Sequence, residues 1–421
     1  MEKNNKEDWV ECAFEDLLNY EQPTKYIVES TQYNDKYNTP VLTAGKTFIL
    51  GYTNETTGIF DNIPTIIFDD FTTATQFVNF KFKVKSSAMK ILVPTSNLVN
   101  MLFVYYAMQV NQVRNDTHKR YWISVFAKKR FYLPPLKEQK SIVAKTEELF
   151  SSLDSGIADL TKAQEQLVVY RQAVLKKAFE GELTNNSEEV NVVKLGTVIE
   201  KPRYGTSKKC TTMVHGKAVL RIPNIRNGVI STEELKYAEF EETEISTLAL
   251  KKGDILTIRS NGSVDLVGKC AMINKKDEDY LFAGYLIRLR PNLEKAVPKY
   301  LLHCLSSHNL RVQIESKAKS TSGVNNINTG ELESLEIPIF SLDEQNQIVR
   351  EIESRLSVCD KVEESIVESL EKAKALRQSI LKKAFEGKLL SEEEIEKCKQ
   401  EKDYEPAYKL LERIKGREEE K

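Results

Sequence analysis

The chain has 421 residues, which is too long for one ordinary hydrophobic core and predicts two or three domains. Its 61 Lys and Arg residues balance 62 Asp and Glu residues to a net charge of −1, so the average charge predicts neither a general polyanion binder nor an acidic tail protein. Six cysteines without C-x-x-C spacing, no basic-then-apolar leader and no apolar run of membrane-spanning length predict a soluble cytoplasmic protein that has no membrane partner.

Residues 1–135 are predicted to form a mixed domain of strands and helices. Residues 65–68 and 80–84 are short, rich in β-branched or aromatic side chains and bounded by turn-forming residues, as strands are. Residues 99–110 have the length and apolar content of a helix. This pattern indicates an α+β unit of ordinary domain size.

Residues 136–183 predict one long amphipathic helix. Leu153, Leu160, Leu167 and Val174 recur every seven residues among Lys, Glu and Gln, which is the spacing of a coiled-coil seam. Prolines before the segment and Gly181 after it are boundary signals. A helix of this length cannot bury its apolar stripe alone, so we expect a helical partner.

Residues 190–340 predict a second mixed domain, with strands at 255–258 and 285–289 and a helix at 299–313. A polar linker at 184–189 separates it from the first long helix. Lys and Arg outnumber Asp and Glu in this domain, although they do not in the whole chain. The domain could therefore favour a polyanion.

Residues 341–390 repeat the first long helix. Glu138-Gln139 recurs as Glu344-Gln345, and the sequence L-K-K-A-F-E-G at 175–181 recurs at 381–387, both at an offset of 206 residues without a gap. The stripe of the second copy comprises Ile348, Val362, Ile366, Leu370, Ala373 and Ile380. Antiparallel packing of the two copies would close both seams within one chain. The charged tail at 391–421 is predicted to be a solvated or frayed helix.

No motif for intrinsic catalysis or metal binding is present. Gly45-Lys46-Thr47 resembles the end of a phosphate-binding loop, but Pro40 stands where that motif requires glycine. The four histidines are scattered, and no Cys/His group has metal-ligand spacing, so we expect no metal site. Ordinary surface or partly buried histidines explain His303 and His308.

Two segments of the second domain carry side chains suited to DNA. Arg259, which can bind guanine O6 and N7, is followed by Ser260 and by Asn261, which can bind adenine N6 and N7. The alternative is that Asn261-Gly262 is simply a hairpin turn. A second polar loop at 317–326 is suited to phosphates and base edges, although a merely flexible loop would look similar.

At the same offset of 206, the first domain places Lys119-Arg120 opposite Asn325-Asn326. The candidate DNA-binding residues in both domains are Lys46, Lys119, Arg120, Lys208, Lys209, Arg221, Asn224, Arg226, Arg259, Ser260, Asn261, Lys319, Ser320, Thr321, Asn325 and Asn326.

These features together resemble the specificity subunit of type I restriction-modification enzymes, in which two target-recognition domains alternate with two conserved helical regions. The resemblance rests on the helix starts at 134–139 and 338–345, both L-K-K-A-F-E-G ends, and the segments L-R-I-P-N-I at 220–225 and R-S-N-G at 259–262. The first domain departs from this pattern, because residues 43–48 replace the R-I-P-N-I segment.

The resemblance implies a fold class: α+β, with two mixed target-recognition domains separated by two long helices that pack as an antiparallel coiled coil with a pseudo-twofold repeat. The implied domains are residues 1–135 and 190–340 for recognition, 136–183 and 341–390 for the helical regions, and 391–421 for the tail. Each recognition domain would dock on half of a bipartite, asymmetric double-stranded DNA site, and the helices would hold the halves near one helical turn apart, about 34 Å.

The resemblance also implies that chemistry belongs to partner subunits and that this chain holds no cofactor. Two copies of a modification (methyltransferase) subunit would use S-adenosylmethionine to methylate adenine, and a restriction subunit would use ATP and Mg as translocase and nuclease. The repeated helices would present a platform to the modification subunit. Candidate partner-binding residues are Glu138, Gln139, Phe179, Glu344, Gln345 and Phe385.

Two other interpretations remain open on the sequence. The chain could be a structural adaptor whose domains bind proteins and whose coiled coil only dimerises. It could instead be a nuclease of an unfamiliar kind with dispersed carboxylates such as Asp69, Asp70 or Asp254.

Overall fold

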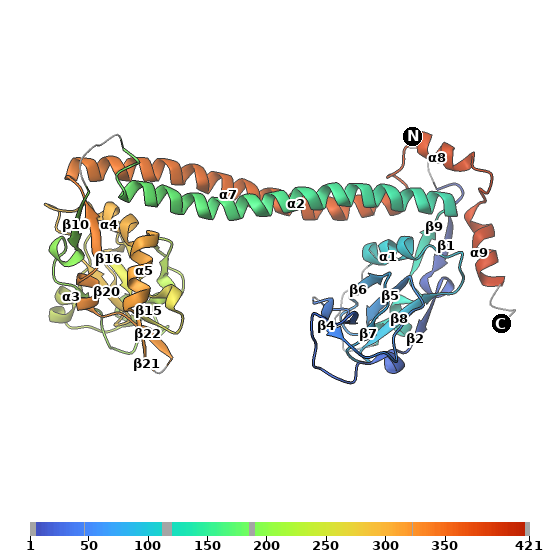
Figure 1. Ribbon diagram of the computed structural model, residues 1–421, viewed down its shortest axis with the longest axis horizontal. Coiled ribbons are helices and arrows are strands. Elements are labelled where there is room, and N and C mark those ends of the chain that lie inside the picture. The colour runs from blue at the N-terminus through green and yellow to red at the C-terminus, as the bar shows by residue number, and fades with distance from the viewer. Residues whose placement is uncertain (1–5, 46, 112–119, 185–189, 322, 417–421) are drawn as a thin grey trace. The chain divides into compact units, whose positions relative to one another are not determined.

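The computed structural model describes residues 6–45, 47–111, 120–184, 190–321 and 323–416 (Figure 1). The chain divides into two compact units: residues 1–160 with 368–421 form unit 1, and residues 161–367 form unit 2. Each unit therefore contains one mixed domain, here called a head, together with part of each long helix. No helix among the described residues is long and apolar enough to cross a membrane.

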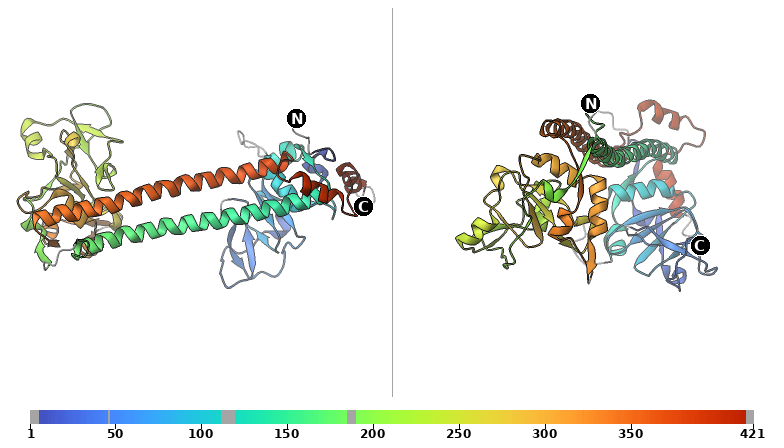
Figure 2. Two further views of the ribbon diagram at one scale, coloured as in Figure 1. Left: turned by 90° about the horizontal axis from the view of Figure 1, so that it is seen from above. Right: turned by 60° about the vertical axis from the view of Figure 1, so that its left-hand side comes forward.

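The two long helices are confirmed. Helix α2 spans Leu136–Phe179 and helix α7 spans Leu342–Phe385, so both have 44 residues and their bounds differ by the repeat offset. In unit 1 the beginning of α2 lies beside the end of α7, and in unit 2 the end of α2 lies beside the beginning of α7, so the pairing is antiparallel in each unit (Figures 1 and 2). Most of the predicted stripe faces inward, but Val362 is 42% exposed, contrary to prediction.

Ion pairs between the helices follow the repeat. Arg171 of α2 binds Asp360 of α7 at 2.7 Å in unit 2, and in unit 1 Arg377 binds Asp154. Both members of the second pair stand at the repeat positions of the first. The antiparallel register is thus marked twice by the same pair of residue types.

Both long helices end in the same way. Gly181 and Gly387 have φ of 79° and 74°, a left-handed conformation that residues with a Cβ seldom adopt. The amide of the next residue then donates to a carbonyl five residues back, from Glu182 to Lys177 at 2.9 Å and from Lys388 to Lys383 at 2.8 Å. This is a Schellman-type helix end, which explains why the L-K-K-A-F-E-G sequence closes with glycine.

The head of unit 1 contains three small sheets and a helix. The strands are β1 (Val10–Ala13), β2 (Leu18–Glu21), β3 (Thr39–Leu42), β4 (Ile49–Thr53), β5 (Thr65–Asp69), β6 (Thr75–Val78), β7 (Lys83–Val84), β8 (Met89–Pro94) and β9 (Arg130–Leu133), with α1 (Met101–Val110) before β9. The sheets have the orders β2-β8-β5-β6, β4-β3-β7 and β1-β9. All pairings are antiparallel except β3 with β7.

The head of unit 2 repeats this topology with insertions. Its common strands are β10 (Asn191–Lys194), β11 (Arg203–Tyr204), β12 (Lys217–Leu220), β15 (Lys236–Ala238), β16 (Ile255–Ile258), β18 (Cys270–Met272), β19 (Leu281–Phe282), β20 (Leu286–Leu289) and β23 (Glu336–Ile339), with α4 (Pro298–Leu305). The sheets β11-β20-β16-β18, β15-β12-β19 and β10-β23 match those of unit 1, including one parallel pair, β12 with β19. The two heads therefore share a fold although their sequences look mostly unlike.

Unit 2 has further short elements that have no counterpart among the described residues of unit 1. They are β13 (Ile225–Arg226), β14 (Val229–Ile230), α3 (Glu242–Leu248), β17 (Ser260–Asn261), α5 (His308–Lys317), β21 (Lys319–Thr321), β22 (Val324–Asn326) and α6 (Thr329–Glu333). The single helix predicted at 299–313 is wrong in detail, because α4 and α5 are separate helices with Ser306 and Ser307 between them. The strand predicted at 80–84 is shorter, since only Lys83 and Val84 lie in β7.

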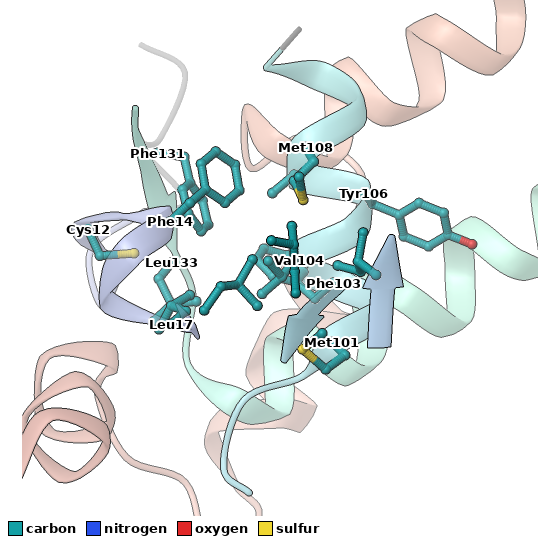
Figure 3. Packing of buried hydrophobic residues seen from close by; sticks show 14 of the residues in the cluster. Cys12, Phe14, Leu17, Met101, Phe103, Val104, Tyr106, Met108, Phe131 and Leu133 are labelled. Atoms are coloured by element: carbon teal, nitrogen blue, oxygen red, sulfur yellow. The ribbon is translucent and has the colours of Figure 1, made fainter. Parts of the chain in front are cut away.

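The core of unit 1 is built where β1, α1 and β9 meet (Figure 3). The rings of Phe14 and Phe131 stack with centroids 4.5 Å apart, and Phe103 and Val104 of α1 are fully buried beside them. The buried faces of both long helices complete this core. The head and the helices of unit 1 thus share one hydrophobic interior.

The tail corrects a prediction. Residues 391–416 form α8 (Glu392–Lys399) and α9 (Ala407–Gly416), and Leu410 and Ile414 of α9 are buried in the core of unit 1. The amide of Ala407 donates to the carbonyl of Asp8 at 3.0 Å. The predicted solvated helix was wrong because α9 buries one apolar face, formed by Ala407, Leu410, Leu411 and Ile414, against the head.

Candidate nucleic-acid interface

In unit 2 the two segments predicted to contact DNA form one small sheet. Ser260 and Asn261 of β17 pair with Asn326 and Asn325 of β22, and β21 pairs with the other edge of β22. Figure 1 places β21 and β22 at the end of this unit away from the long helices. The strands β17 and β21 are 58 positions apart in sequence (319−261), and the meeting of the two segments could not be derived from either one alone.

The alternative interpretation of Asn261 is confirmed in part, because Asn261 is not in a two-residue hairpin turn but its side chain stabilises the turn that follows β17. Asn261 lies in β17, and its side-chain Oδ1 accepts a hydrogen bond from the amide of Ser263 at 2.9 Å. Asn325 donates from Nδ2 to the carbonyl of Gly262 at 3.0 Å. These bonds hold the turn after β17 against the strand that carries the second candidate set.

Arg259 stands where the buried strand β16 reaches this sheet. Its guanidinium lies 4.5 Å from the centroid of the Tyr204 ring, and its Nε donates to Oδ1 of Asn326 at 3.1 Å. The backbone amide of Arg259 donates to the carbonyl of Tyr285 at 2.9 Å, and the backbone carbonyl of Arg259 accepts from the amide of Ile327 at 2.9 Å. Tyr204 was missed in the sequence, where nothing connects it with Arg259.

Several candidates instead have structural partners. Asn224 is fully buried, accepts from the amide of Arg221 at 2.8 Å, and donates to the carbonyls of Ser231 and Glu233. Its prediction as a DNA contact was wrong, because all its hydrogen bonds serve the turn after β12. Arg221 donates to the carbonyl of Glu234 at 2.7 Å and its Nε is buried, so it supports the same turn.

The remaining basic candidates of unit 2 lie at the surface. Arg226 pairs with Glu233 at 2.8 Å, and Lys208 pairs with Glu244 at 2.6 Å. Lys209 is exposed. Lys319, Ser320 and Thr321 form the backbone of β21, and their side chains lie outside the described part of the structure.

The first head offers little described chemistry at the corresponding places. Residues 43–48 follow β3 as residues 221–226 follow β12, which confirms that these segments correspond in the fold. Lys46 and Lys119 lie outside the described residues, whereas Arg120 is exposed.

The carboxylates considered for a nuclease have structural partners. Asp69 accepts from the amides of Phe71 and Thr72, and Asp70 is buried, accepting from the amide of Trp122 at 2.9 Å. Asp254 forms two 2.7 Å bonds with Arg290. The described residues contain no group of three or more His, Cys, Asp or Glu side chains that could hold a metal ion.

Four of the six candidate partner-binding residues have structural partners within the chain. Glu138, Gln139, Glu344 and Gln345 are buried, with at most 8% exposed. Gln139 donates to the carbonyl of Pro134 at 2.8 Å, and Gln345 donates to that of Phe340, the repeat equivalent, at 2.9 Å. These residues tie each helix start to its own head, which gives them a structural role.

The glutamates next to them also face inward. Glu138 accepts hydrogen bonds from Trp9 Nε1 at 2.8 Å and from the Tyr404 hydroxyl at 3.1 Å, while Glu344 accepts from Thr184. Burial raises the pKa of Glu138 despite these two donors. In unit 1 the tail thus supplies a partner to Glu138, and in unit 2 the linker supplies one to Glu344.

The two phenylalanines bind the far helix ends to the heads. The Phe179 ring of α2 lies 5.4 Å from Tyr300 of α4 in unit 2, and the Phe385 ring of α7 lies 5.0 Å from Phe103 of α1 in unit 1. Each helix therefore begins against one head and ends against the other. Nearly all of the repeated sequence is explained by this shared anchoring.

The helix pair carries an apolar surface that the sequence analysis did not assign. In unit 1 a groove between the helices is lined by Leu149, Gly156 and Leu160 of α2 and by Ala373 and Leu376 of α7. At the repeat positions of Ser152, Gly156 and Leu376, unit 2 has exposed apolar residues: Val358 at 59%, Val362 at 42% and Tyr170 at 46% exposure.

Duplicated helices with a common anchoring pattern and two heads of one topology define a DNA specificity subunit of the type I restriction-modification class, and comparison with known proteins agrees. The family model described as type I restriction modification DNA specificity domain matches residues 6–168 and 187–372. The chain belongs to this family, whose specificity subunits are not themselves enzymes.

Two curated relatives come from Escherichia coli. The chain is 32% identical to the type I restriction enzyme EcoR124I/EcoR124II specificity subunit over 391 residues, covering 86% of this chain and 89% of the relative. It is also 32% identical over 292 residues to the EcoKI specificity subunit of strain K12, covering 68% and 63% of the two chains.

Solved structures support the fold. A chain from a study of complex assembly and conformational transition of the type I restriction-modification system matches with a TM-score of 0.70 and 19% identity, over 90% of this chain and 98% of the other. The HsdS subunit from Thermoanaerobacter tengcongensis matches with a TM-score of 0.55 and 18% identity, over 91% and 98%. These structural similarities confirm the predicted fold class, whereas the family is shown by the family model and the E. coli relatives.

Proposed function

We propose that this chain recognises a bipartite, asymmetric DNA site through its two heads and directs adenine methylation or restriction by partner subunits. The observation that carries the proposal is the combination of duplicated helices with two heads of equal topology but mostly unlike sequence. Equal topology suits equivalent docking on two half-sites, and different side chains suit different base sequences.

In this proposal the lengths of α2 and α7 determine the permitted gap between the half-sites. Both helices have 44 residues and are anchored at both ends by repeated residues, so neither head is joined by a loose linker to its own helix start. Inserting seven residues, about two helical turns, into each helix should change the tolerated gap and leave the half-sites unchanged.

The proposed platform for the modification subunit is the apolar face of the helix pair. The groove of unit 1 and the exposed Val358, Val362 and Tyr170 of unit 2 occupy repeat-related positions, which suits two copies of one partner. Apolar surface of this kind typically marks a protein interface. S-adenosylmethionine would be used by the modification subunit, and ATP and Mg by the restriction subunit.

The test is DNA binding by the complex of this chain with its modification subunit. Methylated adenines mapped in the host genome give the site, and the dissociation constants for that duplex and for a scrambled duplex are then measured. We expect the intact site to bind at least 10³-fold more tightly, as specific complexes typically do. Equal binding of both duplexes would favour a protein adaptor, and cleavage of DNA by the chain alone with Mg²⁺ would show an enzyme.

A further inference from the structure

Resting on the proposed function, we infer that Arg259 reads a guanine and that Tyr204 and Asn326 are positioning residues that hold its guanidinium ready to do so. The inference concerns a single cluster in unit 2, defined by these three side chains from β11, β22 and the end of β16. The sequence alone does not indicate that these three residues lie together.

The first step is the state of the guanidinium. Its Nε is occupied by Asn326, whereas the described residues give its two terminal nitrogens no hydrogen-bond or ion-pair partner. Neither nitrogen is among the buried polar atoms that lack a partner in the described part of the structure. Two terminal donors in one plane match O6 and N7 of guanine in the major groove.

The second step is the contrast with neighbouring cations. Arg290 is bound to Asp254, Arg226 to Glu233 and Lys208 to Glu244, so their charges are already paired within the head. Arg259 faces an aromatic ring and an amide oxygen, neither of which neutralises its charge. It is held in place while its charge and its two terminal donors remain usable.

The third step is the rigidity of the holders. Tyr204 is paired with Ile287 in the sheet, and its hydroxyl accepts from the amide of Thr329 at 3.2 Å. Asn326 is paired with Ser260 in β22, next to the fully buried Ile327. The ring and the amide are therefore fixed by the fold before any ligand arrives.

A fixed arginine loses less freedom on binding than a mobile one. Immobilising a long side chain typically weakens binding roughly 2- to 10-fold. In this cluster the Arg259 side chain would already be ordered by folding, so DNA binding would not include that loss of entropy. This gain in affinity appears only on the matching base pair, where both terminal nitrogens of Arg259 have acceptors. Loss of a holder should therefore reduce discrimination at one base pair more than it reduces general affinity.

The experiment uses the complex with the modification subunit and a set of duplexes, each with one base pair of the mapped site replaced. Arg259→Lys keeps the charge but not the planar fork, and it should lower discrimination at one G·C pair by roughly 10-fold with little change in binding to scrambled DNA. Tyr204→Leu should lower discrimination at the same pair by roughly 2- to 10-fold. Tyr204→Phe keeps the aromatic ring and should retain most of the discrimination at that pair.

Tyr285→Ala is the matched control, because this exposed tyrosine contributes only its backbone carbonyl to Arg259. It should leave discrimination unchanged. Binding of scrambled DNA at wild-type affinity shows that a variant has folded. Equal losses on all duplexes for Arg259→Lys or Tyr204→Leu, or an effect of Tyr204→Leu at a different pair, would overturn the inference. If the wild-type complex itself fails to discriminate, the proposed function fails instead.

Discussion

Removing the buried leucine of the tail should destabilise one unit of the chain and spare the other. Leu410 of α9 is fully buried in the core of unit 1. Truncating such a leucine to alanine costs about 2–5 kcal/mol, because the transfer free energy of the removed atoms is lost and a cavity remains. Since the tail is enclosed by the head, we expect a value near the middle of this range for Leu410→Ala.

The assay is native-state hydrogen exchange followed by peptide, combined with chemical denaturation. Exchange in β1 and α1 of unit 1 should speed up by an amount that matches the loss in free energy of unfolding, while β16 and β20 of unit 2 should be unaffected. Tyr408→Ala is the control, because Tyr408 lies on the same helix and is 50% exposed. Unchanged protection in unit 1, or equal loss in both units, would refute the view that the tail is part of the first head.

Three further predictions concern the helices. Gly181→Ala and Gly387→Ala should each lower the free energy of unfolding by about 1 kcal/mol, since both glycines have positive φ. Gly156→Ala should raise the free energy of unfolding by about 1 kcal/mol, because Gly156 lies inside α2 and a Cβ there would meet open space. Denaturant titration measures all three. Burial raises the pKa of the Glu138 carboxyl above its unfolded value, so the folded state binds the carboxyl proton more tightly than the unfolded state does. The free energy of unfolding should therefore fall as pH rises from about 4.5 through the raised pKa. Glu138→Gln should flatten that part of the curve of stability against pH, and an unaltered curve would contradict the reasoning. If two modification subunits bind as proposed, Gly156→Leu should fill the groove of unit 1 and leave one bound per chain in native mass spectrometry, while Val362→Leu, at the repeat position, should leave two.

The elements that repetition marks were predictable. The seven-residue spacing and the duplicated ends located the starts of α2 and α7 within about one residue and their ends within about five, because periodicity and end signals are local properties of the sequence. The role of Glu138 and Gln139 was not predictable in the same way. A repeated polar pair suits a partner surface as well as an internal anchor, and only the burial of both residues distinguishes the two.

Long-range pairing accounts for most of what the sequence did not reveal. The common topology of the heads depends on pairings such as β3 with β7, which the unlike sequences of the two heads do not indicate. The contact between Tyr204 and Arg259 likewise depends on strand order. The error over the tail has another cause, since overall charge obscured the one apolar face of α9.

The gapless repeat has a consequence for how such a chain can change. Because the duplicated stretches correspond residue for residue and meet their heads through the same glutamine and phenylalanine contacts, a genetic crossover between them keeps the reading frame and every anchoring residue. A new head inherited in this way would arrive with its attachment already matched. Specificity could then be replaced by half at a time, without redesign of the scaffold.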